Sequence, residues 1–456
     1  MSRRIPQLVC LLALLSSCPS SAATAAEPAP APAARPAPPD FYLGGIQVNE
    51  ADHRAWFAAL TEERMNTVEV TAYAHQGDWD SDNLFWDAEA PWVVEEMRGA
   101  RARGLHVVFI ARVALDHAFP RNQFLWHGMI QPKTDALLDA FFARYTRFVL
   151  EWARRCEEQG VEIFAIGSEM NALASTLPAP ALPALEEYYL DPEKQRQRRQ
   201  LVAAEAAKID PGFPTELEAR MATEKLWAAQ VTAGESLAEV NARRRRLDQH
   251  WRRLIAEVRQ VFTGKLTYAA NFDQYQQVGF WDQLDLMGIN AYFKLRREIL
   301  PPGERERLYP LLLDGWRGVL GEIAAFRQHQ QLERMPVIFT EMGYTRRALS
   351  TLEPWSDAGF SLVELPGNQP PGQTGEAAPQ RQLIVWRDQP DDKEERALAV
   401  RALHEVHAAL PAPFLRGILY WKLSSHDYHE KNESFMVLVG GPSRDPILPE
   451  LRRFLR

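Results

Sequence analysis

Cysteine is scarce in this sequence, which has three among 456 residues. Two of them, Cys10 and Cys18, lie in an apolar N-terminal segment, and only Cys156 lies beyond it. The rest of the chain can therefore form no internal disulfide and no cysteine-based metal site. It also lacks an uninterrupted apolar run of about 18 residues, which excludes a transmembrane helix from the body of the chain.

Signatures of several protein classes are missing as well. There is neither a P-loop nor a nucleophile elbow, and we expect no cofactor and no bound metal. The net charge of −8 gives no reason to expect a nucleic-acid partner. With 46% hydrophobic and 25% charged residues, the composition is that of an ordinary globular protein.

The N-terminus has the pattern of an export signal. In "MSRRIPQLVCLLALLSSC" (1–18) two arginines precede an apolar core and then small residues, which predicts a secretory signal peptide. "LSSC" resembles the bacterial lipobox, which implies lipidation of Cys18 and anchoring to the outer membrane. Ordinary cleavage after "SAATA", giving a periplasmic or secreted protein, is the alternative. Residues 19–40 are rich in proline and alanine, so we expect an extended linker before a single domain over 41–456.

The domain alternates β-rich runs with longer amphipathic stretches. Eight such runs are apolar along most of their length, as in a parallel sheet covered on both faces. Eight βα units in one domain predict a TIM (β/α)8 barrel. An open doubly wound sheet is the alternative, although no glycine-rich fingerprint follows the first run. The runs are 41–48, 66–74, 106–115, 161–170, 265–272, 285–293, 334–345 and 416–425.

Two long insertions interrupt this repeat, over 174–240 and 346–390. Both follow a run that ends in Glu. The first is charged and rich in alanine and predicts helix, either as a hairpin on the barrel exterior or as a wall of a cleft. The second contains "PGNQPPGQTGEAAP" and predicts a long loop, which in a compact domain is usually functional or disordered.

Two glutamates stand where buried strands end. Glu169 closes the fourth run in "FAIGSEMN", and Glu341 closes the seventh in "VIFTEMGYT". The chemistry of a TIM barrel sits at the C-terminal ends of its strands, so both carboxyls should face one mouth. A retaining glycosidase needs such a pair, one carboxyl as acid/base and the other as nucleophile. A single Glu could equally be a salt-bridge partner or a helix cap.

The phrases "AIGSEM" and "PVIFTEMGYT" resemble glycoside hydrolase clan A, and within it family 113, whose members include β-mannanases. The resemblance runs from about Phe41 to the C-terminus. It implies that Glu169 is the acid/base and Glu341 the nucleophile, and that β-1,4-mannan is cleaved with retention. Most of the clan has Asn before the acid/base, where it binds substrate. Ser168 stands there in this chain, which resembles family 113 more closely than the rest of the clan, and the resemblance makes Ser168 a candidate substrate-binding residue.

Other strand-end residues are candidates for the substrate site. The resemblance implies that Tyr292 hydrogen-bonds the nucleophile and that Trp421 forms the floor of a sugar site, with Lys422 beside it. Asn271 and Asn290 could bind hydroxyls or cap a turn. Further candidates are Arg112, for a carboxylate in the mouth or a structural ion pair, and Trp79, Trp86, Trp126 and Trp355, for sugar stacking in mouth loops.

Three interpretations of function follow. The first is an exported or lipid-anchored retaining glycosidase, monomeric, with a polysaccharide or oligosaccharide substrate. The others are a non-catalytic carbohydrate-binding barrel and a structural envelope lipoprotein, neither of which needs two paired Glu. "HEVH" (404–407) has the wrong spacing for a zinc helix and predicts a helix face. "SHDYHE" (425–430) could hold a metal, but a polar loop is the simpler interpretation.

Overall fold

The structure is a computed structural model of the chain. It describes residues 33–46, 52–86, 90–180, 235–301, 303–356, 389–427, 433–441 and 445–456, four positions at 200, 203, 204 and 207, and the backbone of 361–365 and 380–384. The predicted signal peptide, Cys18 and most of the 174–240 insertion lie outside these residues.

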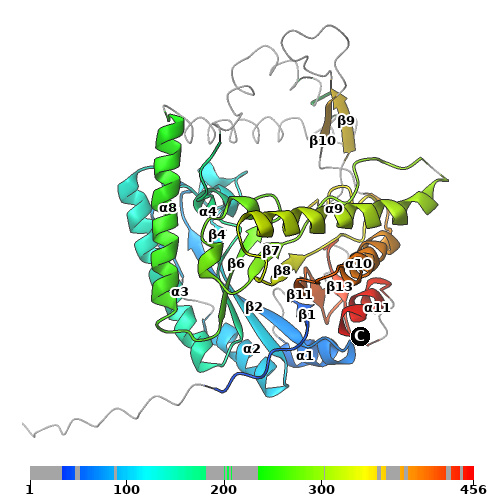
Figure 1. The fold of residues 1–456 in the computed structure, drawn as a ribbon, viewed down its shortest axis with the longest axis horizontal. Helices are drawn as coiled ribbons and strands as arrows, with labels where there is room; N and C mark the ends of the chain where they lie inside the picture. Colours follow the sequence, from blue (N-terminus) through cyan, green and yellow to red (C-terminus); the bar gives the residue numbers. More distant parts are fainter. Residues whose placement is uncertain are drawn as a thin grey trace, which may run out of the picture. The chain divides into compact units, whose positions relative to one another are not determined.

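Eight parallel strands close into a barrel, as the sequence predicts (Figure 1). Each strand pairs with its neighbours in chain order, and β1 pairs with both β2 and β11, which closes the sheet. A short ninth strand, β3 (Leu84–Phe85), pairs antiparallel with the end of β2. The barrel strands are β1 (Tyr42–Gly45), β2 (Thr67–Gln76), β4 (His106–Leu115), β5 (Ile163–Ser168), β6 (Lys265–Asn271), β7 (Met287–Asn290), β8 (Val337–Met342) and β11 (Leu415–Tyr420).

Helices surround the strands (Figure 1). The Ser236 hydroxyl and the Glu239 side chain form a capping box that fixes the start of α8. The helices are α1 (His53–Glu62), α2 (Ala90–Ala102), α3 (Asp135–Glu158), α4 (Asn171–Ala174), α8 (Leu237–Val258), α9 (Leu308–His329), α10 (Lys393–Ala408) and α11 (Ile447–Leu451). Single 3-10 turns are η1 (Pro120–Asn122), η2 (His127–Met129), η3 (Tyr275–Gln277), η4 (Trp281–Gln283), η5 (Arg305–Arg307) and η6 (Arg452–Leu455).

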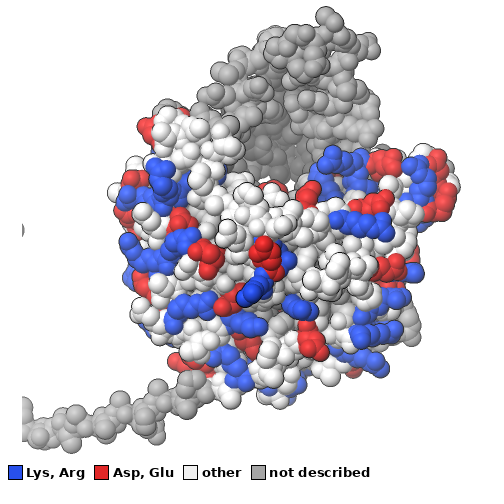
Figure 2. All heavy atoms as spheres, viewed as in Figure 1, with Lys and Arg blue, Asp and Glu red and all other residues white. Residues whose placement is uncertain are grey.

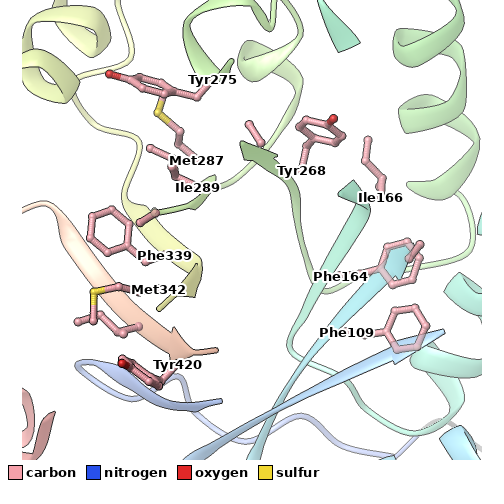
Figure 3. Packing of buried hydrophobic residues seen from close by; sticks show 14 of the residues in the cluster. Phe109, Phe164, Ile166, Tyr268, Tyr275, Met287, Ile289, Phe339, Met342 and Tyr420 are labelled. Carbon is pink, nitrogen blue, oxygen red and sulfur yellow. The ribbon is translucent and has the colours of Figure 1, made fainter. Parts of the chain in front are cut away.

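Strand residues alternate between two apolar layers. One layer lies between the strands and the helices: Phe109 of β4 stacks on Phe164 of β5 at 5.3 Å and on Trp152 of α3 at 5.2 Å. Figure 3 shows this layer continuing through Phe339 to Tyr420. The other layer fills the barrel and includes Val108, Ile110, Ile163, Ala165, Ala269, Ile338 and Leu419. Because both faces are buried, the strands read as continuous apolar runs.

Residues 33–40, predicted to belong to the linker, contact the barrel. The Arg35 guanidinium donates to the Val161 carbonyl at 2.7 Å and to the Thr263 hydroxyl at 2.6 Å, and it pairs with Glu157. Val161 and Thr263 precede β5 and β6. The segment therefore lies at the N-terminal ends of the strands.

Two short sheets lie outside the barrel sheet. The second insertion contains an antiparallel pair, β9 (Ser361–Leu365) and β10 (Gln380–Ile384). Near the C-terminus, β12 (Leu423–Ser424) pairs with β13 (Val437–Leu438).

Among the helices that the structure describes, none is long and apolar enough to cross a bilayer. Acidic and basic side chains are interspersed over the face seen in Figure 2.

Candidate active site

A cleft of about 770 Å³ opens at the C-terminal ends of the strands. Both Glu169 and Glu341 line it, as the sequence predicts for a shared mouth. Its other lining residues are Tyr73, Arg112, Val113, Ala114, Trp126, His127, Ser168, Asn271, Phe272, Asp273, Tyr292, Trp355, Trp421 and Phe435.

Glu341 is held by two side chains, one from β4 and one from the residues that follow β7. It lies in β8, 4% exposed, and pairs in register with Asn290 at the end of β7. That register brings Tyr292 alongside, and its hydroxyl donates a hydrogen bond of 2.5 Å to Oε2. On the other side, Arg112 Nη2 of β4 lies 2.5 Å from Oε1. Both oxygens of the carboxyl are therefore fixed in position.

Glu169 adopts a backbone conformation that is rare for a residue with a side chain. Its φ is +52°, in the left-handed region, where strain is tolerated mainly at functional positions. The Glu169 amide donates to the Ala269 carbonyl at 2.8 Å, which keeps the turn against β6. Its carboxyl Oε2 lies 3.0 Å from Nε2 of His127, on the 3-10 turn η2.

The two carboxyls differ in their affinity for a proton. Burial raises the pKa of Glu341 and the charge of Glu169 adds to this, so the pKa stays above its usual value despite Arg112 and Tyr292. Burial also opposes ionisation of Glu169, but the hydrogen bond and charge of His127 outweigh it and hold its pKa below the usual value. Of these two carboxyls, Glu341 therefore binds a proton more readily.

Polar side chains under the cleft connect the two carboxyls. The Ser168 hydroxyl lies 3.4 Å from Arg112 Nη1 and 3.3 Å from the Asn290 amide nitrogen. The Asn290 oxygen accepts from the Thr340 hydroxyl at 2.8 Å. Asn290 is fully buried and does not line the cleft. Its side chain bonds to Ser168 and Thr340 and also forms a hydrogen bond with Glu169, so Asn290 supports the site from within the barrel.

The model of Glycoside Hydrolase Family 113 matches residues 46–176 and 219–363, more than half of the sequence. The chain belongs to this family. It is accordingly a glycoside hydrolase, and its substrate is a carbohydrate. No curated protein sequence matches the chain.

Solved structures of family 113 share the fold over nearly the whole chain. The GH113 β-mannanase of Alicyclobacillus acidocaldarius is 16% identical, with 90% of this chain and 95% of that chain covered and a TM-score of 0.53. A structure described as a GH113 β-1,4-mannanase is 18% identical, with 91% and 99% covered and a TM-score of 0.55. At these identities the similarity establishes the TIM-barrel fold.

The other predicted site residues of this family 113 enzyme divide into two groups. Asn271 and Trp421 line the cleft, with the Asn271 oxygen accepting from the Phe272 amide at 2.9 Å. The Trp421 ring lies 5.8 Å from the Arg112 guanidinium. Lys422 is buried outside the lining and pairs with Glu433 at 3.4 Å.

Two of the four loop tryptophans reach the cleft. Trp126 and Trp355 line it and are 38% and 43% exposed. Trp355 stacks on Phe272 at 5.4 Å, which holds its ring as a platform. Trp79 is buried, and the Trp86 indole donates to Glu151 at 2.9 Å, so these two pack within the fold.

Sequence reasoning missed several residues of the site. His127 lies in a loop without a recognisable motif, and Asp273 and Phe435 line the cleft from other loops. Glu69 is different, because a carboxylate inside the apolar run "NTVEVTAYA" was a visible signal. It lies inside the barrel, 2.8 Å from Arg112.

The two histidine motifs do not form a metal site in the part of the chain that the structure describes. "HEVH" lies on α10, which agrees with the predicted helix face. In "SHDYHE", residues 428–430 fall outside the described residues. Elsewhere among those residues, no group of three or more His, Cys, Asp or Glu is arranged to hold a metal ion.

Proposed function

We propose that this enzyme cleaves a β-linked polysaccharide or oligosaccharide with retention of anomeric configuration, with β-1,4-mannan as the substrate. The observation that carries the proposal is the position of Glu341. Its carboxyl is fixed by Tyr292 and Arg112 in the same cleft that Glu169 lines from the fourth barrel strand. A carboxyl held at both oxygens is suited to attack the anomeric carbon, because the carboxyl is already oriented before the substrate binds.

The proposed reaction has two displacements. Glu169 gives its proton to the glycosidic oxygen while Glu341 attacks the anomeric carbon, so that the glycosidic bond breaks and a glycosyl ester forms. Glu169, now ionised, then takes a proton from water. The water oxygen attacks the same carbon, and the ester bond to Glu341 breaks. The proton lost in the first step is thereby restored.

The contact between His127 and Glu169 bears on the first step. His127 Nε2 lies 3.0 Å from Oε2 of Glu169, and this contact holds the pKa of Glu169 below its usual value against the effect of burial. A bound sugar excludes water from the cleft, and burial disfavours the ionised form of a carboxyl. Sugar binding therefore favours the protonated Glu169 that the first step requires.

Aromatic residues support a polysaccharide as the substrate. Trp126 and Trp355 present exposed rings along the cleft, on which the CH-rich face of a sugar can stack. Two such rings in one cleft suit a substrate of several sugar units. Mannan as the sugar rests on similarity, since related structures of the family are described as β-mannanases.

Hydrolysis of purified β-linked polysaccharides tests the proposal. Wild-type enzyme and Glu341→Ala are incubated with β-1,4-mannan, β-glucan, β-galactan and a bacterial exopolysaccharide, and products are sized by chromatography. We expect mannan to be shortened to a ladder of oligosaccharides by the wild type alone. Cleavage of another polymer instead would refute mannan. Binding without cleavage of any of them would favour a non-catalytic carbohydrate-binding barrel.

We further propose that the enzyme is exported, acts as a monomer and is anchored to the outer membrane through Cys18. The signal pattern and "LSSC" support this, as does Arg35, which fastens the end of the linker at the strand ends opposite the cleft. Mass spectrometry of the mature N-terminus should find a diacylated or triacylated Cys18. A free amino terminus near Ala26 would refute anchoring, and light scattering tests the monomer.

A further inference from the structure

A buried carboxyl that the proposed reaction does not use lies inside the barrel. Glu69 comes from β2, and its side chain is 0% exposed, so that no sugar can touch it. Its Oε1 accepts a hydrogen bond of 2.8 Å from Arg112 Nη2. In the described part of the chain, Arg112 is its only hydrogen-bond partner, because Oε2 has none. A buried carboxyl with one partner needs a physical reason, since burial disfavours its charge.

The reason lies in the atom that Glu69 contacts. The same nitrogen, Nη2, lies 2.8 Å from Glu69 and 2.5 Å from Glu341. Arg112 has a long side chain with considerable rotamer freedom, and ordering such a side chain costs up to about 2 kcal/mol. Glu69 gives this nitrogen a second acceptor besides Glu341, which restricts that freedom. Glu69 therefore fixes from below where Arg112 presents its charge.

We propose that Glu69 is a positioning residue, which holds the Arg112 guanidinium against the nucleophile Glu341 without touching the substrate. The inference rests on the function proposed above. It adds a residue from the barrel interior that fixes the nucleophile through Arg112.

The protonation of Glu69 fits this role. Burial raises its pKa to about 8 against the attraction of Arg112, and the charges of Glu341 and Glu96 act in the same direction as burial. Near neutral pH, Glu69 therefore holds its proton and offers Oε1 as a neutral acceptor. A neutral partner orients Arg112 but leaves its positive charge to Glu341.

The test compares wild type with Glu69→Ala, Glu69→Gln and Thr71→Val on a β-1,4-mannan. We expect kcat of the Ala variant to fall about 10- to 100-fold, the effect of a shift of about 1 Å in a catalytic group. KM should stay within about twofold, since Glu69 touches no substrate. Glu69→Gln keeps an oxygen acceptor and should recover most of the lost activity. Thr71 lies two residues along the same strand and bonds to the Ile110 carbonyl, so Thr71→Val is the matched control and should retain wild-type kcat.

The pH profile separates positioning from a structural role. Without Glu69, Arg112 moves away from Glu341, whose pKa then rises. The acidic limb of kcat/KM should therefore move to higher pH in Glu69→Ala but not in Thr71→Val. An unchanged limb with wild-type kcat would overturn the proposal, as would a Gln variant as impaired as the Ala variant. If the Ala variant does not fold, Glu69→Asp withdraws the carboxyl by one methylene, and full kcat there would refute positioning.

Crystal structures of wild type and variant keep this inference distinct from the proposed function. In Glu69→Ala, or in Glu69→Asp if the Ala variant does not fold, the Arg112 guanidinium should lie beyond hydrogen-bond distance from Glu341. An Arg112 that keeps its wild-type position would overturn the inference. This readout needs no substrate, so it decides the role of Glu69 even if the wild-type enzyme cleaves none of the polysaccharides. Failure to cleave any of them would refute the proposed function but not the role of Glu69.

Discussion

Removal of the Tyr292 hydroxyl should move the pH range over which the enzyme works. That hydroxyl donates a 2.5 Å hydrogen bond to Glu341, and Tyr292 is 8% exposed. Tyr292→Phe keeps the ring and its contact with Phe435 while deleting the donor. Because the hydrogen bond favours the ionised form of Glu341, its loss raises the pKa of that carboxyl.

The size of the shift follows from the strength of such bonds. A hydrogen bond to a charged group contributes about 1.5–3 kcal/mol, and one pKa unit corresponds to about 1.4 kcal/mol. The pKa of Glu341 should thus rise by about 1–2 units. The proposed nucleophile attacks only when ionised, so the acidic limb of kcat/KM should move to higher pH by the same amount. At a pH below the acidic limbs of both enzymes, kcat/KM of Tyr292→Phe should be about 10- to 100-fold lower than that of the wild type.

The assay is kcat/KM between pH 4 and 9 on a soluble β-1,4-mannan. Tyr145→Phe is the matched control, because it deletes another buried hydroxyl, which donates 2.7 Å to the Ile166 carbonyl away from the cleft. Both variants should lose some stability, but only Tyr292→Phe should shift the limb. An acidic limb that does not move in Tyr292→Phe would refute the assignment of Glu341 as a nucleophile tuned by Tyr292.

Four further outcomes are expected. Glu341→Ala should lower kcat by more than about 10³-fold with little change in Tm, and near wild-type turnover would contradict its role. The first-formed product should keep the anomeric configuration of the substrate, as proton NMR before mutarotation can determine, and an inverted product would exclude double displacement. Trp355→Ala should raise KM for mannan about 3- to 10-fold through lost stacking, with kcat nearly unchanged; an unaltered KM would remove Trp355 from the binding site. The pKa of Glu69 lies near 8, above its unfolded value, so its contribution to stability is complete below the unfolded pKa and is lost as pH rises through about 8. Urea midpoints should therefore fall more steeply from about pH 5 to 8 in wild type than in Glu69→Gln, and parallel curves would refute that pKa.

The barrel and its pair of glutamates could be predicted because they depend on chain order alone. Most strand residues are apolar on both faces, and Glu169 and Glu341 stand at or directly after the C-terminal ends of β5 and β8. Parallel strands closed into a barrel bring such ends to one mouth, whatever the details of packing. The sequence alone could therefore predict that Glu169 and Glu341, although far apart in the chain, lie at the same mouth of the barrel.

Contacts that depend on loop paths or on register were not predictable. His127 reaches Glu169 from a 3-10 turn after β4, and no periodic pattern specifies where such a loop returns. Asn290 stands at a strand end, but it is fully buried and contacts Ser168, Thr340 and Glu169 from within the barrel. Side-chain direction at a strand end depends on the last ladder bonds, and β7 and β8 shift register just before this point.

The charges of the site explain why the carboxyls differ. Three carboxyls share two basic side chains, since Arg112 contacts Glu69 and Glu341 while His127 contacts Glu169. Three ionised carboxyls in a poorly hydrated barrel would repel one another, so one must hold a proton. Burial selects it: the Glu69 side chain is 0% exposed, against 5% for Glu341 and 13% for Glu169. With Glu69 neutral, the charge of Arg112 acts on Glu341, while Glu169 keeps its contact with His127, and each proposed catalytic carboxyl then has a basic partner of its own.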